Sequence, residues 1–122
     1  MHKTELSSSV AIKLFTALME AKKLRLLWIS YNNITDEACD AIIMAMKKNT
    51  SLVRLKMHNN PISEKCAQLI VQALQYNSTL QELCLNKNYS DDIKKKIVSL
   101  QEEINEKRET CGCQVKLWIT FW

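Results

Sequence analysis

The sequence predicts an α/β fold in which short strands and helices alternate and stack into a solenoid, with a short curved parallel sheet on the concave side and helices on the convex side. Residues 52–62 have apolar side chains at their first, fourth and sixth positions and asparagine at the ninth, and this pattern recurs 28 residues earlier and 28 residues later. Each copy is followed by apolar residues at helical spacing. Since neither element can bury its apolar face alone, such units stack on one another.

The repeat divides the chain into one domain, residues 1–109, and a C-terminal segment, residues 110–122. Within the domain we expect a partial repeat at 6–23, full repeats at 24–51 and 52–79, and a C-terminal capping repeat at 80–109. The capping repeat departs from the pattern, because Ser90 stands where earlier copies have Ile34 and Ile62, and its helix begins one residue early. Residues 110–122 alternate with period two, which predicts a closing strand, with a disordered tail as the alternative.

Apolar residues at helical spacing are predicted to face the core, together with Leu27, Ile29, Leu55 and Met57 from the strands. The expected N-caps are Ser7, Ser8 or Ser9, then Thr35 or Asp36, then Ser63. The inward helical residues are expected to be Leu6, Val10, Leu14, Ala17 and Leu18; Ala38, Ile42, Ala45 and Met46; Cys66, Ile70, Ala73 and Leu74; and Ile93, Ile97, Leu100 and Ile104.

Asparagines recur where each strand ends and the chain turns. The amide of an asparagine donates and accepts hydrogen bonds, so Asn32, Asn60 and Asn88 are predicted to form a structural ladder that satisfies buried turn groups. Asn49 and Asn77 occupy a second repeated position, at the end of a helix, where we expect the left-handed conformation.

Length, charge and cysteine content limit the partners and the location. The chain has 122 residues, of which 47% are hydrophobic, as expected of one globular domain. The net charge of +4 is spread along the chain, so no nucleic-acid partner is expected. No apolar run is long enough to span a membrane, so no membrane partner is expected. The absence of a secretory signal and the odd count of five cysteines indicate a reducing, cytoplasmic location.

The sequence contains no motif for catalysis, cofactor binding or metal binding. A single glycine and a single proline exclude the glycine-rich loops that cradle phosphates, so we expect no cofactor. His58, Cys84 and the pair Cys111 and Cys113 do not have the spacing of a four-ligand zinc site, so we expect no metal. No nucleophile and base stand at a recognised catalytic spacing, and we predict that the chain is not an enzyme.

The outward strand positions on the concave face are the predicted contact surface for a protein partner. An exposed tryptophan beside cations is typical of an interface anchor. The candidate partner-binding residues are Trp28, Ser30, Arg54, Lys56, His58, Glu82 and Asn86. The first full strand has no expected neighbour on its N-terminal side, and this open sheet edge predicts self-association.

The repeated residues carry a resemblance to a known family. Leu24, Leu27, Ile29, Asn32 and Ile34, with their two copies, resemble leucine-rich repeats of the ribonuclease-inhibitor type. The segments 43–52 and 71–80 are similar to the C-terminal repeats of NOD-like receptors, particularly the CARD-containing branch. The resemblance covers about residues 6–104 and implies a protein-binding or ligand-sensing module, a fragment or relative of a cytosolic innate-immune receptor. The alternative is a ribonuclease-inhibitor-like or GTPase-activating regulator of an enzyme that binds through the concave face.

Overall fold

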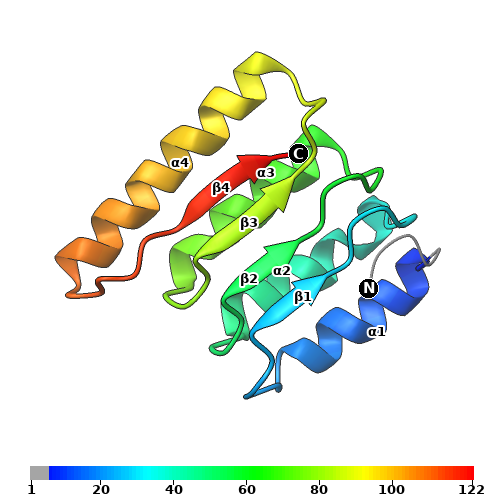
Figure 1. Cartoon of the computed structure of the whole chain (residues 1–122), viewed down its shortest axis with the longest axis horizontal. Coiled ribbons are helices and arrows are strands. Elements are labelled where there is room, and N and C mark those ends of the chain that lie inside the picture. The colour runs from blue at the N-terminus through cyan, green and yellow to red at the C-terminus, as the bar shows by residue number, and fades with distance from the viewer. Residues whose placement is uncertain (1–5) are drawn as a thin grey trace.

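The computed structural model describes residues 6–122 as one parallel sheet with helices on one side (Figure 1). Residues 1–5 of the predicted unit 1–109 lie outside the described residues. The strands are β1 (Leu26–Trp28), β2 (Arg54–Lys56), β3 (Glu82–Leu85) and β4 (Trp118–Phe121), in the spatial order β1-β2-β3-β4. The helices are α1 (Ser8–Leu18), α2 (Cys39–Lys48), α3 (Glu64–Ala73) and α4 (Asp91–Thr110), with short 3-10 helices η1 (Asp36–Ala38) and η2 (Leu74–Tyr76).

The register of the sheet follows the sequence repeat through three strands and then departs from it. Leu26 pairs with Arg54, and Arg54 pairs with Glu82, so each partner lies one sequence repeat further along the chain. Glu82 pairs with Trp118, because the long helix α4 and its following loop lie between β3 and β4.

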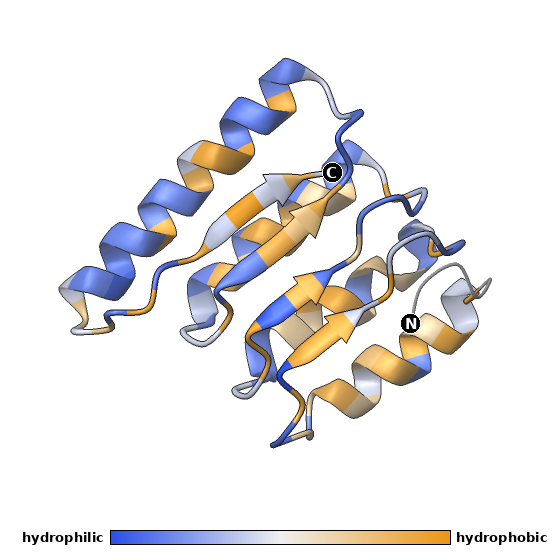
Figure 2. Cartoon of the chain, in the orientation of Figure 1, coloured by the Kyte–Doolittle hydropathy of each residue, from blue (hydrophilic) through white to orange (hydrophobic). Residues whose placement is uncertain are grey.

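The predicted α/β class with a parallel sheet is confirmed, but the predicted solenoid is corrected. The described chain forms a small domain of four strands. The regular series of register steps ends after β3, and α4, which follows β3 in the chain, is hydrophilic along most of its length in Figure 2.

Serine and threonine side chains cap the N-termini of the helices, at nearly regular intervals along the sequence. The Ser7, Thr35, Ser63 and Ser90 side chains each accept a hydrogen bond from a backbone N–H in the first turn of the following helix. A cap of this kind satisfies one of the backbone donors that a helix leaves unpaired at its start. The step from Ser63 to Ser90 is one residue shorter than the earlier steps, so this helix begins one residue early, as predicted.

The core lies between the sheet and the helices, and its predicted composition is confirmed for α2 and α3. In α1 the predicted face is only partly right. Leu18 is buried as predicted, but Val10 is 47% exposed and Ala17 is exposed, and Ala11 and Phe15 are buried in their place. Among the described elements α1 is the end helix of the layer and packs against α2 on one side only. Its inward face is therefore rotated relative to the helices that have neighbours on both sides.

Two cysteines that the sequence reasoning left unpaired form a disulfide. Cys39 and Cys66 join the beginnings of α2 and α3, with their Cα atoms 6.0 Å apart. This separation is one that a disulfide spans. The two positions are 27 residues apart, one residue off the repeat, so the periodicity alone does not pair them. The cysteine count consequently gives no support to a reducing compartment, and Cys84, Cys111 and Cys113 are the free thiols.

Candidate protein-binding face

The side of the sheet opposite the helices is the candidate site, and we call it the open face. Successive side chains of a strand point to opposite sides, so alternate residues of each strand and of the turn that follows it lie here. The open face consists of Leu26, Trp28 and Ser30; Arg54, Lys56 and His58; Glu82, Cys84 and Asn86; and Trp118, Thr120 and Trp122. In Figure 1 the described helices all lie behind the sheet or beside it, so none of them covers this face.

A cation and an aromatic ring meet at the carboxyl ends of β1 and β2. The Lys56 ammonium lies 4.9 Å from the centroid of the Trp28 ring, because the two residues are direct neighbours across the strands. The tryptophan is exposed and Arg54, two residues before Lys56, is exposed as well. The structure therefore brings together three of the predicted partner-binding residues on accessible surface.

His58 and Ser30 are predicted partner-binding residues that the structure buries. The Ser30 hydroxyl lies 3.0 Å from His58 Nδ1. The Tyr31 ring meets the imidazole edge-on at 5.5 Å, and the Trp122 ring lies tilted over it at 6.0 Å. Burial, with a smaller contribution from the nearby Lys56 ammonium, lowers the pKa of His58 below its ordinary value. Both side chains support the face from below and offer little accessible surface, and their contact with a partner stays a prediction.

The Cys84 side chain is likewise buried beneath the open face. The Thr120 hydroxyl lies 3.2 Å from its sulfur, and Trp122 Nε1 donates to the same hydroxyl at 2.9 Å. Burial raises the pKa of the Cys84 thiol, so this sulfur stays protonated and unreactive at neutral pH. The remaining candidates are both half-buried: Glu82 begins β3, and Asn86 directly follows it.

The most exposed aromatic residues of the open face lie in β4 and directly after it, and they were not among the predicted site residues. Trp118 is 58% exposed and Trp122 is 61% exposed. The signal for them was present, since the period-two alternation of the last eight residues places both tryptophans on the side opposite Leu117 and Ile119. What the sequence left open was the neighbour of this strand, which the structure shows to be β3.

The asparagine ladder at the carboxyl ends of the strands is present for Asn32 and Asn60. Asn60 Nδ2 donates to the Ile29 and Met57 carbonyls at 3.0 and 2.9 Å, and its Oδ1 accepts from the Ile34 amide. Asn32 Nδ2 donates to the Ile29 and Ser30 carbonyls, and its Oδ1 accepts from the Leu6 amide.

The third predicted member of the ladder, Asn88, lies exposed in its turn. Asn86 takes the bridging role instead, accepting from the Asn59 amide and donating to the Asn60 carbonyl at 2.7 Å. The Tyr89 hydroxyl donates to the Ile62 carbonyl at 2.8 Å, and burial raises the pKa of Tyr89 to about 12. The shortened turn has shifted the chain, so the prediction for Asn88 is corrected.

A second ladder runs along the amino ends of the strands. Asn77 Nδ2 donates to the Met46 carbonyl at 2.9 Å, as Asn49 Nδ2 donates to the Leu18 carbonyl at 2.8 Å. Asn49 and Asn77 are extended and not left-handed, because in this conformation their Oδ1 atoms accept from amides of the following strand approach. Arg108 is the last member of this ladder. It is buried at the end of α4 and donates to the carbonyls of Asn77, Leu80 and Val115.

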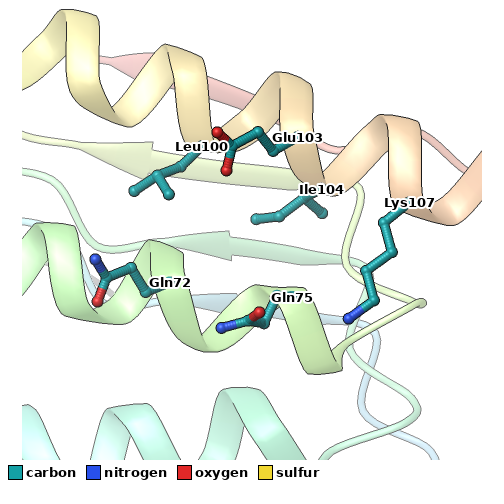
Figure 3. Close-up of a pocket in the computed structure, with 6 residues that line it drawn as sticks. All are labelled: Gln72, Gln75, Leu100, Glu103, Ile104 and Lys107. Atoms are coloured by element: carbon teal, nitrogen blue, oxygen red, sulfur yellow. The ribbon is translucent and has the colours of Figure 1, made fainter.

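The helix layer carries a shallow hollow between α3 and α4. Figure 3 shows Leu100 and Ile104 pointing from α4 towards α3, where Gln72 and Gln75 face them. Glu103 and Lys107 complete the lining. Across residues 6–122 no three metal-ligating side chains gather into a cluster, and none of the helices there is long and apolar enough to cross a membrane.

Comparisons with known proteins find a likeness in structure only. No protein-family model matches the chain, and no curated protein matches it in sequence. Among solved structures, the chain is similar to leiomodin-1 actin-binding site 2, with a TM-score of 0.82 and 20% sequence identity. The match covers 99% of this chain and 67% of the leiomodin chain. At this identity the likeness shows the fold.

This finding overturns the resemblance drawn from the repeated residues. A solved structure that shares the fold is leiomodin-1 actin-binding site 2, and the described chain is a small α/β domain with four parallel strands. Recognition as a leucine-rich repeat of a NOD-like receptor was wrong, as were the expected innate-immune role and the alternative of a ribonuclease-inhibitor-like or GTPase-activating regulator. The recurring leucines and asparagines reflect the packing of strand, turn and helix, which is a requirement of the fold and not of a receptor function.

Proposed function

We propose that this chain is a protein-binding domain and not an enzyme, and that its partner is actin. Support for the partner comes from the likeness to leiomodin-1 actin-binding site 2 over nearly the whole chain. The observation that carries a binding role is the open face itself, where exposed tryptophans at both ends of the sheet flank the cations of β2. Exposed aromatic residues beside cations are over-represented among the residues that dominate binding energy.

Direct binding to purified actin tests the proposal. Adding actin monomers to the fluorescently labelled chain should raise the fluorescence anisotropy of the chain. Actin filaments should carry the chain into the pellet on sedimentation. We expect a dissociation constant of about micromolar or tighter. The matched variants are Trp118→Ala on the open face and Tyr76→Ala on the helix layer, which each remove an exposed aromatic ring. Of these two variants, only Trp118→Ala is expected to lose binding.

The variant Trp28→Ala is a second test of the open face. We expect it to weaken binding to actin far more than it lowers the melting temperature, because its ring lies on accessible surface. No binding of the unaltered chain to monomers or filaments would refute actin as the partner. Equal binding by the Trp118→Ala and Tyr76→Ala variants would remove the open face from the proposal.

Self-association through the N-terminal edge of the sheet stays a prediction. β1 is the first strand in the spatial order, so one of its edges is an end of the sheet. Light scattering over a range of concentrations measures whether the chain forms dimers, and a monomer at high concentration would contradict this prediction.

A further inference from the structure

One row of side chains crosses all four strands of the open face with alternating chemistry. Leu26, Arg54, Glu82 and Trp118 are successive cross-strand neighbours, at the amino ends of β1, β2, β3 and β4. Leu26 is 45% exposed, Arg54 and Trp118 are exposed, and Glu82 is half-buried. Read across the sheet, this first row is apolar, cationic, anionic and apolar.

We propose that the first row binds an amphipathic helix of the partner laid across the strands, with an apolar residue at position i, an acid at i+3 or i+4, a base at i+7 and an apolar residue at i+10 or i+11. The proposal rests on the proposed function and specifies the chemistry of the partner segment. The same helix in the opposite direction reads apolar, base, acid, apolar.

The spacing of the strands favours a helix as the occupant. Neighbouring strands lie about 4.8 Å apart, and an α-helix rises about 1.5 Å per residue, so a helix advances about 3.2 residues from one strand to the next. Residues three and four apart lie on the same face of a helix, so one face meets all four strands in turn. An extended segment advances about 3.3 Å per residue, and its side chains alternate between faces, so successive strands would not meet the same face.

The charges of the first row determine what the middle of the helix carries. An acid opposite Arg54 forms a charge-assisted contact, whereas the same acid opposite Glu82 is repelled. A helix with two acids at the middle positions therefore complements Arg54 of β2 and is repelled by Glu82 of β3, and a helix with two bases does the reverse. The apolar ends are satisfied by Leu26 and by the indole of Trp118, which is the larger anchor.

Two synthetic peptides of about sixteen residues, both helical by design, test the proposal. The first carries leucine, glutamate, lysine and leucine at i, i+4, i+7 and i+11, and the second carries leucine, lysine, lysine and leucine there. Binding is measured by anisotropy of the labelled peptide. The unaltered chain should bind the first peptide about ten-fold more tightly than the second, because the second places a lysine opposite Arg54.

The variant Arg54→Glu should invert this preference, since its row then carries two acids between the apolar ends. Lys95→Glu, which makes the same charge change on an exposed position of α4, should leave the preference unaltered. Inversion by Arg54→Glu together with an unchanged Lys95→Glu supports the assignment. Equal affinity of the unaltered chain for both peptides, or no binding of either, overturns it.

The outcome is separable from that of the proposed function. Binding of the chain to actin that survives in both Arg54→Glu and Trp118→Ala would retain the partner and reject the first row as the contact. Peptide binding with the expected charge preference, in a chain that does not bind actin, would retain the first row and reject actin.

Discussion

The regular middle of the molecule and its C-terminal end use different side chains to satisfy backbone groups at the ends of the strands. Between β1 and β3, asparagines at two repeated positions bridge one turn to the next, as Asn60 and Asn77 do. At the C-terminal end the bridging side chains come from α4. Arg108 donates to the Leu80 carbonyl at the amino end of β3, Asn105 forms hydrogen bonds with the backbone of residue 117, and Gln101 accepts from the amide of residue 119. In the middle region the bridging amides come from the turns between repeats, whereas at the C-terminal end the bridging side chains all come from one helix.

The largest expected effect is that of removing the arginine at the C-terminal end. Arg108→Ala leaves the buried carbonyls of Asn77 and Leu80 without their donor, so we expect the free energy of unfolding to fall by about 3 to 4 kcal/mol. Urea denaturation measures this change. Glu109→Ala, exposed on the same helical turn, is the control and should change it by less than about 0.5 kcal/mol. Equal small effects would show that Arg108 is dispensable.

The next effect concerns the covalent link in the middle region. The disulfide between Cys39 and Cys66 closes a loop of 27 residues, and its reduction should lower the free energy of unfolding by about 3 kcal/mol. Thermal melts with and without a reducing agent measure the difference. The double variant Cys39→Ala with Cys66→Ala is the control, because its melting temperature should not respond to the reducing agent. A melt of the unaltered chain that is independent of reductant would contradict the link.

A smaller effect separates the two asparagines that the sequence treats as equivalent. Asn60→Ala should destabilise the fold by about 1 to 3 kcal/mol, because the Ile34 amide and the Ile29 carbonyl lose their partner. Asn88→Ala, at an exposed position in the shortened turn, should cost less than about 0.5 kcal/mol. Chemical denaturation of both variants compares the regular turn with the altered one, and equal losses would mean that Asn88 belongs to the ladder after all.

The smallest effect is a dependence on pH that arises from His58, where the middle region meets Trp122. Its pKa in the folded chain lies below the value of 6.5 that the unfolded chain has, so the unfolded state binds the proton first as the pH falls. Stability is therefore fully present above pH 6.5 and decreases as the pH falls below it. Melting temperatures of the unaltered chain and of His58→Asn between pH 7.5 and 5.5 compare the slopes, and identical slopes would exclude His58 as the cause.

Much of the sheet could be predicted because the strand register equals the sequence repeat. Leu55 and Met57 point inward, as the period-two pattern requires, and Arg54 and Lys56 consequently point outward beside Leu26 and Trp28. Asn60 follows the strand at the turn, where its amide has backbone partners on both sides. These features depend on local spacing and on an identical neighbour, and a single sequence contains both kinds of information.

The remaining features depend on contacts between parts of the chain that no repeat relates. Sequence reasoning could not place Trp122 over His58, bury Arg108 against the Asn77 carbonyl or pair Cys39 with Cys66, because each contact requires the stacked helices and β4 in their final positions. It also failed at Asn88, where the loss of one residue transferred the bridging role to Asn86.

The sequence by itself therefore determined the α/β class, the parallel strands and the side chains that lie on each face of β1 to β3, because these follow from periodicity and local geometry. The tertiary structure decided where the series of units ends, which polar residues support the open face from below, and that Trp118 completes a row with Leu26, Arg54 and Glu82. The physical reason is that burial and cross-strand neighbours depend on packing over the whole molecule.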